Sequence, residues 1–119
     1  MRTKLGLLGL LAVVSACAMS PKVGQVSPAT ALYAVEGNYA AALQLAVAYR
    51  QLPRCPVSAP VCHDPAVVVR LRAANQRART ALRGAETIVA ARGSAAQIEA
   101  AVSLATAEIA DFTATVPRS

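Results

Sequence analysis

The stretch from Asp64 to Gly93 decides the fold; it reads DPAVVVRLRAANQRARTALRGAETIVAARG. Asp followed by Pro is typical of a helix start, because the Asp side chain caps the first turn and Pro fits the first helical position. The pattern predicts an amphipathic helix from Pro65 to about Ala91 or Arg92, with Gly93 as its C-cap residue. Its apolar residues recur every three or four positions and form one stripe: Val67, Leu71, Ala74, Ala78, Leu82, Ala85 and Val89.

The residues that follow predict a second helix packed against the first. Ser94 and Gln97 have the spacing of a capping box, which predicts a helix from Ala95 to about Thr113. Its apolar face holds Ile98, Ala101, Val102, Ala105, Ile109 and Phe112. Because the connection at Gly93 is so short, these two helices are expected to form an antiparallel hairpin.

A third helix is expected before the stretch at Asp64. Ser27 and Pro28 repeat the helix-start signal, and the helix should run to about Gln51, where Pro53 stops it. One stripe holds Leu32, Val35, Tyr39, Ala42, Leu43, Ala46 and Arg50. We expect Glu36, which lies near this stripe, to pair with an arginine of the following helix.

The composition agrees with an all-α fold. Hydrophobic residues make up 55% of the 119, aromatic residues only 3%, and 28 residues are Ala, which argues against a β-sandwich. We predict a small antiparallel three-helix bundle, or a helical hairpin plus one helix, over residues 27–114, with a flexible tail at 115–119. The unequal helix lengths leave parts of the longer helices without a partner, which hints at self-association.

The N-terminal residues 1–16 have the layout of a secretory signal peptide. Arg2 and Lys4 are followed by an uncharged segment from Leu5 to Ala16 that is rich in Leu and Val. As a helix this segment spans about 18 Å, well short of the roughly 30 Å hydrocarbon core of a bilayer. The pattern predicts export to an oxidising compartment without a membrane-spanning helix.

The end of this segment resembles the lipobox of bacterial lipoprotein precursors. The resemblance rests on Val14-Ser15-Ala16-Cys17, an aliphatic residue and two small ones before a Cys, and it covers only residues 1–17. It implies cleavage before Cys17 and a lipid, including palmitate-type acyl chains, on its thiol, with residues 17–26 as a tether. Ala18 in place of Asp implies sorting to the outer membrane if the cell is Gram-negative.

Two alternatives to this anchored form stay open. An ordinary signal peptidase could use Ala16-Cys17-Ala18 as a small-x-small site and cut before Met19, which would release a soluble periplasmic binding module. The small size also fits an envelope or lysis accessory lipoprotein encoded by a phage. In the lipidated form, loss of Arg2 and Lys4 lowers the formal charge from +6 to +4.

Cys55 and Cys62 are predicted to form a disulfide. With Cys17 lipidated they are the two remaining cysteines, they bracket a Pro-rich segment, and an exported chain meets oxidising conditions. A metal site with the neighbouring His63 and Asp64 is a weaker interpretation, because adjacent residues rarely point at one ion and oxidation consumes the thiols. We therefore expect neither a metal nor another cofactor.

The most visible feature of the helical part is an arginine row, Arg72, Arg79 and Arg83, roughly opposite the apolar stripe. It is a candidate basic contact face for anionic lipid headgroups, an acidic envelope polymer or a partner protein, or else an ordinary solvated helix face. Nucleic acid is not an expected partner, since the compartment argues against it and stacking aromatic residues are missing.

The sequence carries no recognisable enzyme motif. It has no Gly-rich phosphate loop, no His-Glu-x-x-His and no Gly-x-Ser-x-Gly, and its carboxylates are scattered. The expected function is therefore that of a small lipid-anchored cell-envelope protein that faces the periplasm. Its non-catalytic helical interaction domain would bind or brace an envelope protein or polymer at the membrane.

Overall fold

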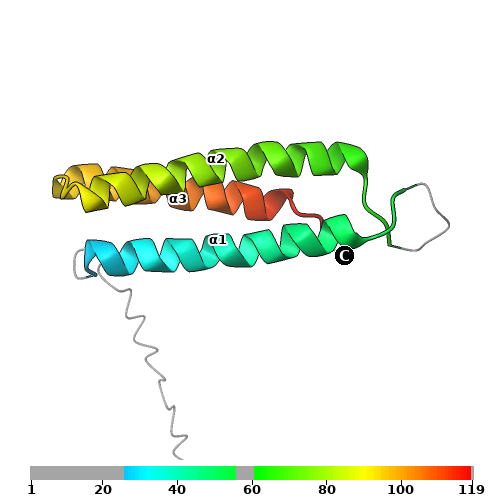
Figure 1. The fold of residues 1–119 in the computed structure, drawn as a ribbon, viewed down its shortest axis with the longest axis horizontal. Coiled ribbons are helices and arrows are strands. Elements are labelled where there is room, and N and C mark those ends of the chain that lie inside the picture. Colours follow the sequence, from blue (N-terminus) through cyan, green and yellow to red (C-terminus); the bar gives the residue numbers. More distant parts are fainter. Residues whose placement is uncertain (1–25, 56–60, 119) are drawn as a thin grey trace, which may run out of the picture.

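The computed structural model describes residues 26–55 and 61–118, which form three helices. These are α1 (Pro28–Gln51), α2 (Pro65–Ala90) and α3 (Ala95–Thr115). Consecutive helices run antiparallel and pack side by side, so the predicted all-α three-helix bundle is confirmed (Figure 1). Of the described helices, none is both long and apolar enough to cross a membrane.

Each helix begins where the sequence predicts, because each has a capping side chain. The backbone N–H of Thr30 donates to Ser27 Oγ at 3.2 Å, and the N–H of Ala66 donates to Asp64 Oδ1 at 2.8 Å. In α3 the capping box is complete: Ser94 Oγ accepts from the N–H of Gln97, and Gln97 Oε1 accepts from the N–H of Ser94. These bonds satisfy backbone donors that the first turn of a helix leaves unpaired.

The core is thin because alanine supplies about half of its buried positions. Phe112 is the largest fully buried side chain, at 1% exposure, and its ring centroid lies 6.3 Å from that of Tyr39. Tyr39 also donates a hydrogen bond of 2.8 Å from its hydroxyl to Asn75 Oδ1, which joins α1 to α2. The buried residues are Val35, Ala42, Ala46, Leu71, Ala74, Ala78, Leu82, Ala85, Ala105, Ile109 and Phe112.

The predicted stripes lie in or against the core, except for Val89 and Ile98 near the α2–α3 turn, which are half-buried outside it, and for the last turn of α1. There Arg50 is exposed, and Tyr49 packs against the core in its place. The reason is that this turn faces the connection to α2, where the N–H of Asp64 donates to the Tyr49 hydroxyl at 2.8 Å. A periodic pattern cannot show this, because the connection and not a helix is the neighbour of Tyr49.

The C-terminal end of α2 differs from the prediction that Gly93 is its C-cap residue. The C-cap is Ala91, and the residue in the left-handed conformation is Arg92, with φ of 54°, while Gly93 has no positive φ. The N–H of Arg92 donates to the carbonyl of Val89 and that of Gly93 to the carbonyl of Ile88, which is a Schellman motif. Gly93 is required for space: a Cβ there would lie 2.7 Å from Ile88 Cγ2.

The α3 helix continues two residues beyond the expected end at Thr113 and stops at Thr115. The Thr115 hydroxyl donates to the carbonyl of Asp111 at 2.8 Å. The following residue, Val116, packs against the core, so Thr115 and Val116 belong to the bundle and not to the predicted flexible tail at 115–119.

Candidate functional site

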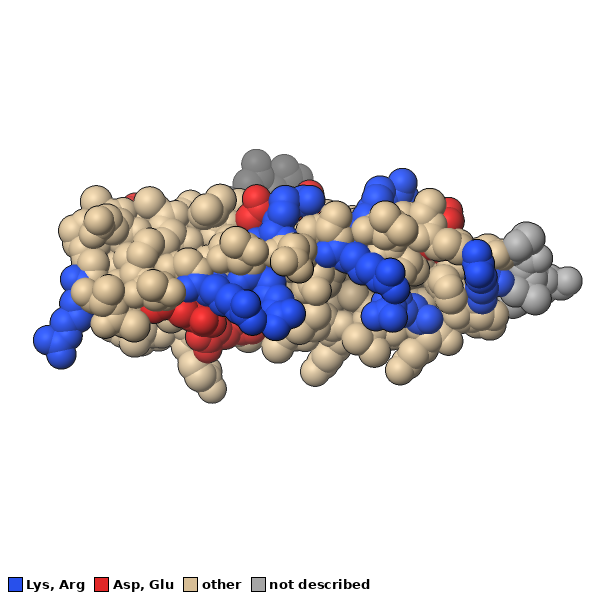
Figure 2. All heavy atoms as spheres, turned by 45° about the horizontal axis from the view of Figure 1, so that its top comes forward, with Lys and Arg blue, Asp and Glu red and all other residues tan. Residues whose placement is uncertain are grey.

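The arginine face of α2, made of Arg72, Arg79 and Arg83, is exposed as predicted. Positions seven and eleven residues apart fall on one side of a helix, and at 1.5 Å per residue the face extends about 16 Å along the axis. Figure 2 shows basic side chains spread along this side of the bundle. The apolar stripe on the opposite side of α2 is buried in the core. The three arginines therefore point toward solvent.

Charge is segregated between two neighbouring helices. The α2 sequence holds five arginines and one acidic residue, Glu86. The α3 sequence holds Glu99, Glu108 and Asp111 and no basic residue. The bundle therefore has one basic and one acidic helix, although the whole chain is only moderately basic.

Two of the three acidic residues of α3, Glu108 and Asp111, neutralise Arg77 rather than the arginine face. Arg77 Nε lies 3.2 Å from Glu108 Oε2, and Arg77 Nη2 lies 2.6 Å from Asp111 Oδ2. Side-chain hydrogen bonds, first to Asp111 and then to Glu108, raise the pKa of Arg77 above its ordinary value. Within the described residues Glu36 pairs with no arginine, so the pairing expected between α1 and α2 is replaced by one between α2 and α3.

The sequence places Arg77 beside the apolar stripe but does not reveal this triad. Arg77 lies 31 positions from Glu108 and 34 from Asp111, so their meeting depends on the register of α2 against α3. The arginines of the arginine face form no ion pair with any described carboxylate. Their charge is consequently available for an anionic partner.

An apolar groove of about 700 Å³ lies between α2 and α3. Small side chains leave it open: an added Cβ at Gly84 would meet nothing within 4 Å. On the α3 side of the groove, Leu104 is 55% exposed. The ion pair between Arg77 and Glu108 lines one end of the groove. The groove therefore offers a mainly apolar surface with one ion pair at its edge. Besides these residues its lining includes Ala81, Ala85, Ile88, Ala100 and Ala101.

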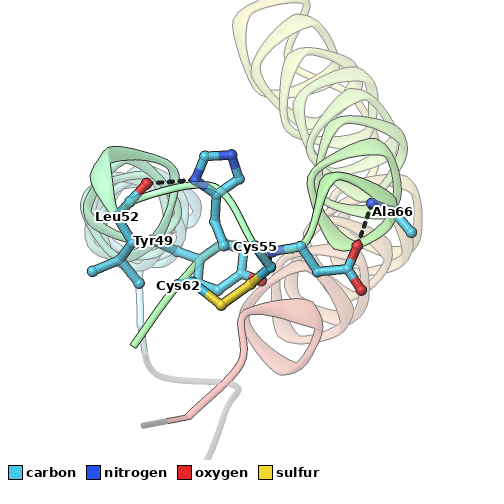
Figure 3. Close-up of a disulfide and its surroundings, with 7 residues drawn as sticks. Tyr49, Leu52, Cys55, Cys62 and Ala66 are labelled. Atoms are coloured by element: carbon cyan, nitrogen blue, oxygen red, sulfur yellow. Dashed lines mark hydrogen bonds between the residues drawn. A yellow bond between two sulfur atoms is a disulfide. The ribbon is translucent and has the colours of Figure 1, made fainter. Parts of the chain in front are cut away.

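The connection between α1 and α2 is held by a disulfide between Cys55 and Cys62, with their Cα atoms 5.3 Å apart (Figure 3). The chain on either side of the bridge pairs through backbone bonds: Cys55 N–H donates to the carbonyl of His63 at 3.0 Å, and His63 N–H donates to that of Pro53 at 2.8 Å. The predicted cysteine pair is thus confirmed, and it fixes where α2 starts relative to the end of α1.

His63 is part of this structural corner. Its Nδ1 hydrogen-bonds to the carbonyl of Leu52, and its ring lies edge-on to Tyr49 with centroids 6.3 Å apart. His63 is half-buried, so it belongs to the packing of this corner rather than to the solvent-exposed surface. Among the described residues no group of three His, Cys, Asp or Glu is placed to hold a metal ion.

Cys17, the predicted lipidation site, lies outside the described residues, as do the signal segment 1–16 and nearly all of the tether at 17–26. Chemically, the described surface offers two things to a partner: an uncompensated row of guanidinium groups and an apolar groove. No family model, curated protein or solved structure matches this chain.

Proposed function

We propose that this chain is a lipid-anchored cell-envelope protein whose non-catalytic helical domain binds or braces a partner at the membrane. The anchor is supported by Val14-Ser15-Ala16-Cys17 and the apolar segment before it. Export is supported by the disulfide between Cys55 and Cys62, because such bonds persist in oxidising compartments.

The observation that carries the interaction role is the uncompensated charge of the arginine face. The arginine face lies on the outer side of α2, away from the acidic residues of α3. Glu108 and Asp111 contact Arg77, and the arginine face makes no ion pair with a described carboxylate. Guanidinium groups are well suited to binding carboxylate and phosphate oxygens.

Metabolic labelling with radioactive palmitate tests the anchor. The wild-type protein should take up label and fractionate with the envelope, and Cys17→Ala should lose both properties. The matched control is the double variant Cys55→Ser/Cys62→Ser, which also removes thiols but should keep the label. Equal labelling of wild type and Cys17→Ala would contradict the anchor, as would label that depends on the loop cysteines.

Cross-linking in envelope fractions tests the interaction role. A partner cross-linked to the wild-type protein, whether a lipid, a polymer or a protein, should be lost from a variant in which Arg72, Arg79 and Arg83 are replaced by Gln. It should be retained in a variant whose groove is filled by Gly84→Leu. The opposite result would move the interaction from the arginine face to the groove.

A further inference from the structure

We propose that the arginine face binds the headgroups of anionic phospholipids, so that the bundle lies lengthwise on the membrane. The inference rests on the proposed function only for the location of the protein. The binding itself does not need a lipid on Cys17, so the two proposals can fail separately.

The charge distribution selects an anionic surface as the partner. The arginine face is exposed and has no described carboxylate within ion-pair distance. Glu86, the one acidic residue of α2, follows Arg83 by three positions but makes no ion pair with it. Of the acidic residues of α3, Glu108 and Asp111 contact Arg77 instead, and α2 with its five arginines is the basic helix of the bundle.

The surroundings of the arginine face favour headgroups over a folded acidic protein. Stable protein interfaces usually contain aromatic or other large apolar anchors. The α2 helix has no aromatic residue, and Val69 is its one exposed large apolar side chain among those described. A headgroup layer needs no such anchor, because its phosphates move to match whatever spacing the arginines have.

The position of the chain start allows this orientation. The α1 helix begins at the end of the bundle where α2 meets α3 (Figure 1). From there, the outer surface of α2 is at most about two helix diameters away, or about 20 Å. The nine-residue step from Cys17 to Val26 can extend to about 30 Å. An anchor at Cys17 therefore permits contact between the arginine face and the same membrane.

Vesicle co-sedimentation with the full mature chain tests the proposal. The protein begins at residue 17 and carries Cys17→Ser, so that no lipid can attach. It should bind vesicles that contain one part phosphatidylglycerol in three, and should not bind pure phosphatidylcholine. Because a basic residue near an anionic surface strengthens binding by about fivefold, the triple variant Arg72→Gln/Arg79→Gln/Arg83→Gln should bind about 100-fold more weakly.

Two variants separate a specific face from general charge. The matched control, Arg70→Gln/Arg92→Gln/Arg118→Gln, removes the same charge from exposed positions outside the arginine face and should bind within about fivefold of wild type. The triple Arg→Lys variant of the face should bind within about threefold, since headgroups recognise the charge. Far-UV circular dichroism confirms that each variant is folded.

Three outcomes would overturn the proposal. Equal losses in the two Gln variants would show that net charge alone drives binding. Equal binding to neutral and anionic vesicles would show that charge is not involved. Binding to an acidic polysaccharide such as polygalacturonate, with none to anionic vesicles, would assign the arginine face to a polymer instead.

Discussion

At the scale of single residues, Arg92 is the clearest case of stored strain. It takes the left-handed conformation, with φ of 54°, at the position where most helices have glycine. A residue with a Cβ is disfavoured there because the Cβ approaches its own carbonyl oxygen, at a cost of about 1 kcal/mol. The sequence suggests Gly93 for this role, but the Schellman bonds place the left-handed residue one position earlier.

Replacing Arg92 by Gly should therefore stabilise the protein by about 1 kcal/mol in chemical denaturation. The control Arg92→Ala removes the same charge but keeps the Cβ, and it should give no such gain. Gly93→Ala should destabilise the protein, because the new Cβ would overlap Ile88. A gain from Arg92→Ala equal to that from Arg92→Gly would show that charge, not backbone strain, is responsible.

Phe112 is the residue on which the thin core depends most. It is the largest fully buried side chain and lies against Tyr39, so it joins α3 to α1. Phe112→Ala should lower the free energy of unfolding by about 3–5 kcal/mol. Leu104→Ala, a large-to-small change at an exposed position of the same helix, should have a much smaller effect. Similar losses in both variants would contradict the assigned core.

At the scale of elements, the disulfide fixes the connection between α1 and α2. The bridge closes a loop of about eight residues, for which the chain-entropy model gives about 2.5 kcal/mol. Cys55→Ser/Cys62→Ser should therefore lower the melting temperature by about 10–20 °C. A reducing agent should lower that of the wild type equally and leave the variant unchanged. A wild-type melting temperature that does not change when the reducing agent is added would refute the bridge.

Two helical glycines give a matched pair that compares the groove with open solvent. An added Cβ would meet nothing within 4 Å at Gly84 on α2 or at Gly37 on α1. Each Gly→Ala change should stabilise its helix by about 0.5–1 kcal/mol. Thermal unfolding of the two variants checks this. A destabilised Gly84→Ala beside a stabilised Gly37→Ala would show that something fills the groove in the folded protein.

The elements were predictable to the extent that their signals are local. Ser27, Asp64 and Ser94 each cap a helix through bonds that span two or three residues, so the sequence alone locates them. The Arg77 triad could not be predicted, because it depends on how α2 and α3 align. The groove could not be predicted either, because it depends on how α2 packs against α3.

At the scale of the whole molecule, two features define the protein: an alanine-lined core and a division of charge between α2 and α3. The first gives a slim bundle that buries little apolar area, so the disulfide supplies a sizeable share of its stability. The second leaves the arginine face outward and uncompensated. Together with the predicted anchor at Cys17, these features support the proposed role of a small module held at a membrane.

The most direct test of this account is intact-mass spectrometry of the mature protein isolated from the cell envelope. The account predicts a chain that begins at Cys17, carries the added mass of a diacylglyceryl group and acyl chains, and retains the Cys55–Cys62 bridge. A chain that begins at Met19, without lipid and recovered in the soluble fraction, would contradict it.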